Sequence, residues 1–140
     1  MNVKMVAVLK MMPMLLIMGI IFFLSEQSGY SLSLHISLLY GADKIAHLLM
    51  YLVLAATVIY AFSDGFKKNF PSITVGLTLF VCLFYGISDE FHQSFTPGRS
   101  VSMFDVVADF TGALLCCAAW LRYRKYREQS ARVTHCTLTN

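Results

Sequence analysis

The sequence predicts an all-α integral membrane protein, a bundle of four transmembrane helices with both termini on the cytoplasmic side (N-in/C-in). Of its 140 residues 57% are hydrophobic and only 14% charged, whereas soluble domains carry about 25% charged residues. Apolar runs near the roughly 20 residues that cross a bilayer cover 5–24, 45–62, 73–92 and 102–121. We expect one domain over residues 1–127 and a polar, disordered cytoplasmic tail over 128–140.

The first run, residues 5–24, has two interpretations. Lys4 and Lys10 lie ahead of a continuous apolar stretch, which is also the pattern of a signal peptide. After Leu24 the chain reads Ser-Glu-Gln-Ser-Gly-Tyr, without a clear small-x-small cleavage site, so a transmembrane span is favoured. Pro13 is expected to bend this helix without breaking it.

The orientation follows from the basic residues, because Lys and Arg in short loops stay on the cytoplasmic side. They lie in the three segments that an N-in/C-in protein keeps inside: Lys4 and Lys10, Lys67 and Lys68, and Arg122, Arg124, Lys125 and Arg127. Most of the net charge of +3 belongs to this pattern. It indicates contacts with membrane lipids and no nucleic-acid partner.

The first outer loop alternates apolar and polar residues from Tyr30 to Leu38. This period favours either an extended surface segment or a short interfacial helix. Asp43 is a suitable N-cap for the second span. The cysteines are expected to be free thiols, since three fall inside spans and one in the tail: Cys82, Cys116, Cys117 and Cys136.

Polar residues recur on one face of the second, third and fourth spans. Asp43, His47 and Tyr51 are each four residues apart, as are Asp105 and Asp109, so each set follows one helix face. Gly112 continues the stripe of the fourth span and allows a neighbouring helix to approach closely. In the third span a shared face is predicted for Tyr85, Asp89, His92 and Gln93, with Glu90 about 100° away at its edge.

All three sets lie at the outer end of their spans, because the second and fourth helices run inward and the third runs outward. An ionised group facing lipid costs roughly 2.5–3.5 kcal/mol at mid-membrane, so we expect these side chains to face one another. The Pro97-Gly98 turn directs Arg99 back towards them. The predicted binding residues are Asp43, Lys44, His47, Tyr51, Asp89, Glu90, Gln93, Arg99, Asp105 and Asp109.

Several chemistries are compatible with this cluster. A divalent metal ion has candidate ligands in His47, Asp89, His92, Asp105 and Asp109. General acid–base catalysis has candidates in His47, Asp89, Glu90 and His92. A purely structural polar network is a further alternative, whereas an ion path is disfavoured because the polar groups stop in the outer half of the spans.

Three motifs in order resemble the VanZ-like family of small bacterial membrane proteins: Asp43-Lys44-x-x-His47-x-x-x-Tyr51, Ser88-Asp89-Glu90-x-x-Gln93-x-Phe95-x-Pro97-Gly98-Arg99, and Asp105-x-x-x-Asp109-x-x-Gly112. The resemblance covers residues 24–115, and it departs at Asp109, where many members carry asparagine.

We expect a VanZ-like multi-pass protein of the bacterial plasma membrane. Because the polar groups converge at one depth, its outer-face pocket is expected to engage a cell-envelope component, and a lipid headgroup or a cell-wall intermediate would suit Arg99 and Lys44. The family's founding member is associated with low-level resistance to teicoplanin, so a link to glycopeptide resistance is an expectation. The alternative is a membrane-embedded enzyme that uses His/Asp acid–base chemistry or a divalent metal on a lipid-linked substrate. Whether the protein is an enzyme stays open at this point.

Overall fold

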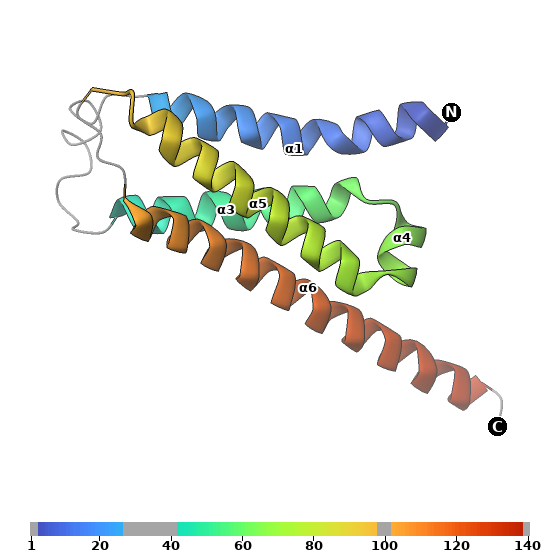
Figure 1. Cartoon of the computed structure of the whole chain (residues 1–140). Coiled ribbons are helices and arrows are strands. Elements are labelled where there is room, and N and C mark those ends of the chain that lie inside the picture. Colours follow the sequence, from blue (N-terminus) through green and yellow to red (C-terminus); the bar gives the residue numbers. More distant parts are fainter. Residues whose placement is uncertain (1–2, 27–41, 98–101, 139–140) are drawn as a thin grey trace.

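The computed structural model describes residues 3–26, 42–97 and 102–138, and the side chains of 5–26, 44–97 and 102–131. The helices within these ranges are α1 (Val3–Glu26), α3 (Ala42–Ala61), α4 (Asp64–Asn69), α5 (Pro71–Gln93) and α6 (Met103–Leu138) (Figure 1). Four stretches of the described chain are long and apolar enough to cross a membrane: Met5–Glu26, Lys44–Ala61, Pro71–Gln93 and Met103–Ala131. The predicted all-α, multi-pass membrane fold is therefore confirmed.

The helix boundaries follow local sequence signals, with small differences from the predicted ones. α1 is continuous through Pro13. α3 begins at Ala42, which places Asp43 inside its first turn and not ahead of it as the N-cap. The loop between α3 and α5 contains the short helix α4, which Ser63 caps by accepting a hydrogen bond from the Phe66 amide at 3.3 Å.

The expectation of a disordered tail is wrong for most of its length, because α6 continues as a helix to Leu138. The physical reason lies in the composition, since this stretch has no Gly or Pro to end a helix and includes the helix formers Glu, Gln, Ala, Arg and Leu. Arg124 and Glu128, one turn apart, also form an ion pair at 2.8 Å. The first outer loop, including residues 30–38, lies outside the described residues.

Helix α3 forms the centre of the bundle and packs most extensively on α6. Figure 1 shows α1 and α6 on opposite sides of α3 and α5. The buried apolar core comprises Ile21, Tyr51, Leu54, Ala55, Val58, Cys82 and Ala113. The three cysteines with described side chains, Cys82, Cys116 and Cys117, are free thiols as predicted.

Gly112 sets the distance between α3 and α6. A Cβ atom built at this position would overlap the backbone carbonyl oxygen of Leu48 and lie 3.1 Å from the Leu52 amide nitrogen. Both obstacles are backbone atoms, which cannot rotate away as a flexible side chain can. The close approach that the sequence predicts for Gly112 is therefore confirmed.

Candidate functional site

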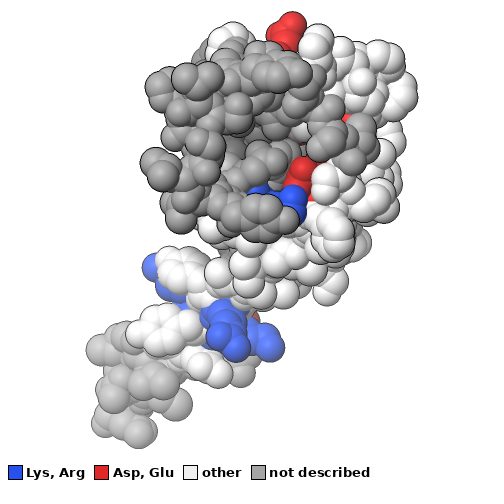
Figure 2. All heavy atoms as spheres, turned by 90° about the vertical axis from the view of Figure 1, so that its left-hand side faces the viewer, with Lys and Arg blue, Asp and Glu red and all other residues white. Residues whose placement is uncertain are grey.

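The polar residues gather at one end of the bundle, where α1 and α5 end and α3 and α6 begin (Figure 1). Figure 2 views the molecule from this end and shows acidic and basic atoms side by side near the middle of the face. We call the set the polar layer, and its described members are Ser25, Lys44, His47, Tyr51, Asp89, Glu90, Gln93, Asp105 and Asp109.

An ion pair and a histidine–carboxylate hydrogen bond join α3 to α6 within the polar layer. The Nζ atom of Lys44 lies 2.9 Å from Oδ1 of Asp105. One turn deeper, Nδ1 of His47 lies 3.0 Å from Oδ1 of Asp109. With Asp109 ionised, its carboxylate can only accept a hydrogen bond, and Nδ1 of His47 is then the donor. Lys44 and His47 are three residues apart on α3 and Asp105 and Asp109 are four apart on α6, so each set lies on one helix face and the two pairs form one above the other.

Helix α5 contributes a second hydrogen-bonded group that reaches α1. The amide Nε2 of Gln93 donates to Oδ2 of Asp89 at 2.9 Å and to Oγ of Ser25 at 3.2 Å. Sequence reasoning missed Ser25, although its place at the end of the first span puts it at the same depth as the other polar residues. Tyr85, one turn from Asp89, also anchors α1 by donating to the Met18 carbonyl at 2.6 Å.

Glu90 belongs inside the polar layer and not at its edge. Its side chain is buried, and Oε2 accepts a hydrogen bond from the backbone amide of Ser102 at 2.9 Å, just ahead of α6. Its carboxyl group also lies within electrostatic range of Asp105, His47 and Asp89. Glu90 thereby connects the end of α5 to the beginning of α6.

Three buried polar atoms of the layer have no hydrogen-bond partner among the described residues: the hydroxyl of Tyr51, Oε1 of Glu90 and Oδ2 of Asp109. Tyr51 is 0% and Asp109 1% exposed. Gly86 of α5 allows the side chains of Tyr51 and Asp109 to lie close to its backbone, since a Cβ atom there would lie 3.0 Å from Oδ2 of Asp109 and 3.5 Å from Cε1 of Tyr51. Buried polar atoms normally have a partner, so these three have hydrogen-bonding capacity that the described protein groups do not use.

His92 does not face the polar layer. Its ring packs on Phe22 of α1 with the ring centroids 4.4 Å apart. Spacing alone predicts only a broad helix face. The packing of α1 on α5 places His92 at the α1 side of that face, away from α3 and α6. Four of the five predicted metal ligands lie in the polar layer, but no three His, Cys, Asp or Glu side chains among the described residues are placed to hold one metal ion. The side chains of Asp43 and Arg99 lie outside the described part of the chain.

The sequence is similar to one known protein family. The sequence model of the VanZ/LLP1 family matches residues 10–124. "Uncharacterized protein C11E3.10" of Schizosaccharomyces pombe is 29% identical over 92 residues, which cover 65% of this chain and 54% of the yeast protein. The chain therefore spans about half the length of this curated relative, which comes from a yeast and not from a bacterium. No solved structure matches the chain.

Proposed function

The chain belongs to the VanZ/LLP1 family, and we propose that its polar layer binds the polar head of a cell-envelope lipid or of a lipid-linked cell-wall intermediate. The single observation that carries this proposal is the set of unpartnered atoms on Tyr51, Glu90 and Asp109. Leaving a buried polar group without a hydrogen bond costs about 1–3 kcal/mol. A bound head group that supplies the missing partners offsets this cost.

The charges of the polar layer favour a ligand that carries an amine. Its described members include four buried carboxyl groups, on Asp89, Glu90, Asp105 and Asp109, against Lys44 and His47. The unpartnered carboxylate oxygens accept hydrogen bonds, so they suit a group that donates, such as an amine. An amine occurs in ethanolamine head groups and on the peptide of cell-wall intermediates.

Lys44 favours a ligand whose anionic group lies at the exposed edge of the polar layer. Its side chain is 48% exposed although it is paired with Asp105, whose side chain is 5% exposed. A zwitterionic head group would place its phosphate near Lys44 and its amine near Glu90. We propose the bacterial plasma membrane as the location, with the polar layer at its outer face, as the distribution of Lys and Arg predicts.

The proposal is tested by asking which lipids stay bound to the purified protein. The wild type and Glu90→Gln are extracted from the same membranes in mild detergent, and retained lipids are identified by native mass spectrometry. We expect Glu90→Gln to lose an amine-bearing lipid that the wild type retains, because the amide removes the charge while keeping the shape.

Glu26→Gln is the matched control, since Glu26 is an exposed acid at the end of α1. It should retain the same lipids as the wild type. Equal retention by wild type and Glu90→Gln, at equal membrane levels, would contradict the proposal. Susceptibility to teicoplanin, compared between cells with wild type and Glu90→Gln, tests the proposed link to glycopeptide resistance separately.

One observation favours an enzyme as the second candidate function. The contact between His47 and Asp109 orients an imidazole against a carboxylate that is 2% exposed, which is the arrangement of a general acid or base. Such an enzyme would act on a lipid-linked substrate. Incubation of membrane lipid extract with wild type and with His47→Gln, followed by mass spectrometry, tests this candidate, and identical products from both would exclude His47 as its catalytic group.

A further inference from the structure

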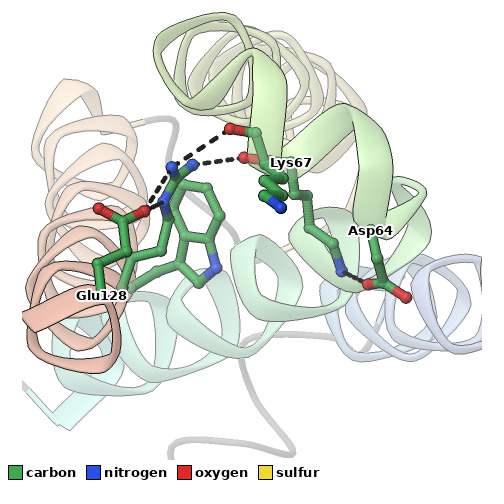
Figure 3. A pocket seen from close by; sticks show the side chains of 6 residues that line it. Asp64, Lys67 and Glu128 are labelled. Atoms are coloured by element: carbon green, nitrogen blue, oxygen red, sulfur yellow. Dashed lines mark hydrogen bonds and ion pairs between the residues drawn. The ribbon is translucent and has the colours of Figure 1, made fainter. Parts of the chain in front are cut away.

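A second polar site lies at the opposite end of the bundle, between α4 and α6. Figure 3 shows this pocket, which has a volume of about 300 Å³, the lower end of the range for small-molecule sites. Half of its lining comes from α4 and half from α6: Asp64, Lys67, Lys68, Trp120, Arg124 and Glu128. None of these residues belongs to the polar layer, so the inference is independent of the proposed function.

Arg124 builds the wall of the pocket. Its guanidinium donates to the backbone carbonyls of Lys67 and Lys68 near the end of α4, and to Oε1 of Glu128 at 2.8 and 3.0 Å. Its Cζ atom also lies 5.8 Å from the centre of the Trp120 ring. These four hydrogen bonds use most of the five N–H donors of Arg124 and hold α4 against α6, which gives the pocket a defined shape.

The charges of the lining leave one cation without an acidic partner. Asp64 pairs with Lys67 at 2.9 Å and with Lys10 at 3.4 Å, and Glu128 pairs with Arg124. Lys68 lines the pocket, is exposed, and makes no ion pair with any described carboxylate. An anionic ligand that enters this pocket would therefore meet an ammonium group that is not already neutralised.

The depth of the pocket indicates the source of the anion. Hydrocarbon about 30 Å thick is crossed by roughly 20 helical residues, so α6 leaves it near Leu121 when counted from Met103. Trp120 and Arg124 then lie at the level of the lipid head groups, where tryptophan is enriched. The next residues of α6 add exposed cations at the same level: Arg122, Lys125 and Arg127.

From these observations we infer that the pocket between α4 and α6 binds the phosphate of an anionic phospholipid. Lys68 would contact the phosphate, and Trp120 would border the glycerol and the upper acyl chains. The paired residues Arg124 and Glu128 act as the scaffold of the site. Basic side chains near a membrane surface attract anionic lipid, and one lysine changes the affinity about fivefold.

Trp120 is the single tryptophan of the chain, so it reports on this pocket directly. The protein is reconstituted in bilayers of phosphatidylcholine and phosphatidylglycerol in which one or the other lipid carries brominated acyl chains. Bromine quenches tryptophan fluorescence at short range, so the quenching gives the relative affinity of the two lipids beside Trp120. For the wild type we expect phosphatidylglycerol to be favoured about fivefold.

Lys68→Gln should reduce this preference to near one, whereas Lys125→Gln, which alters a basic residue of α6 outside the pocket, should leave most of it. Circular dichroism confirms that the variants keep their helices. The inference would be overturned if wild type and Lys68→Gln preferred phosphatidylglycerol equally. It would also be overturned if Lys68→Gln and Lys125→Gln lost this preference equally, because the preference would then come from the general surface charge. Loss of the preference on adding millimolar inorganic phosphate would assign the site to soluble phosphate and also overturn the lipid assignment.

Discussion

Replacing Gly112 by alanine should disturb both the stability of the bundle and the geometry of the polar layer. The new Cβ atom would overlap the carbonyl oxygen of Leu48 and lie 3.1 Å from the amide nitrogen of Leu52. Contacts of this kind are optimal at about 3.5–4.0 Å. Because the obstacles are backbone atoms, α3 and α6 must separate by on the order of 1 Å to relieve the overlap.

The cost has two sources. Overpacking costs about 1–3 kcal/mol, and a separation of about 1 Å stretches the 3.0 Å contact between His47 and Asp109 beyond hydrogen-bond range. A hydrogen bond to a charged group contributes about 1.5–3 kcal/mol, while alanine is about 1 kcal/mol better than glycine in a helix. We therefore expect Gly112→Ala to lower the free energy of unfolding by about 1.5–5 kcal/mol.

The assay is unfolding in mixed micelles with increasing dodecyl sulfate, followed by circular dichroism. Gly19→Ala and Gly76→Ala are the matched controls, because a Cβ atom at either position meets nothing within 4 Å. Both controls should be as stable as the wild type or more stable by up to about 1 kcal/mol, because alanine is the better helix former. If Gly112→Ala unfolds together with these controls, the close approach of α3 and α6 is not what Gly112 provides.

Three further outcomes follow from single contacts. Tyr85→Phe removes the hydrogen bond to the Met18 carbonyl and should lower the free energy of unfolding by about 0.5–1.5 kcal/mol in the same micelle assay. The hydrogen bond and charge of Lys67 hold the pKa of the Asp64 carboxyl below its usual range. A carbon-detected NMR titration should show this low pKa and its return towards the usual value in Lys67→Met; the stabilising contact is present above the unfolded-chain pKa and is lost as the pH falls through the folded pKa. Cys82, which is 0% exposed, should react with a maleimide only after unfolding, as mass spectrometry of the labelled protein can measure.

Each of these has a result that contradicts it. An unchanged unfolding midpoint in Tyr85→Phe would mean that the hydroxyl contributes no net stability at the junction of α1 and α5. If the Asp64 carboxyl of the wild type titrates with the usual pKa of an aspartate, the ion pair with Lys67 does not form in solution. Labelling of Cys82 in the folded protein would show that the core around α5 opens under native conditions.

Much of the architecture could be predicted from the sequence because a bilayer constrains a chain strongly. The length of each apolar run and the cost of an ionised group in lipid together require spans whose polar residues face inward at a common depth. The pairing of Lys44 and His47 with carboxylates and the contact at Gly112 agree with this requirement.

The rotation of each helix about its own axis was decided only in the tertiary structure. Spacing places Glu90 and His92 about 160° apart around α5, one on each side of Asp89, and it was the packing of α1 on α5 that put His92 against Phe22 and left Glu90 inside.

In the end the sequence by itself determined the membrane-spanning helices, the depth of their polar ends and the need for a small residue at Gly112. Only the tertiary structure decided that Ser25 joins the polar layer through Gln93 and that Arg124 closes a pocket against α4. The physical reason is that the free-energy cost of placing an apolar or ionised side chain in lipid or water depends on the local sequence. Hydrogen bonds between helices depend instead on interatomic distances that are set only when the helices pack together.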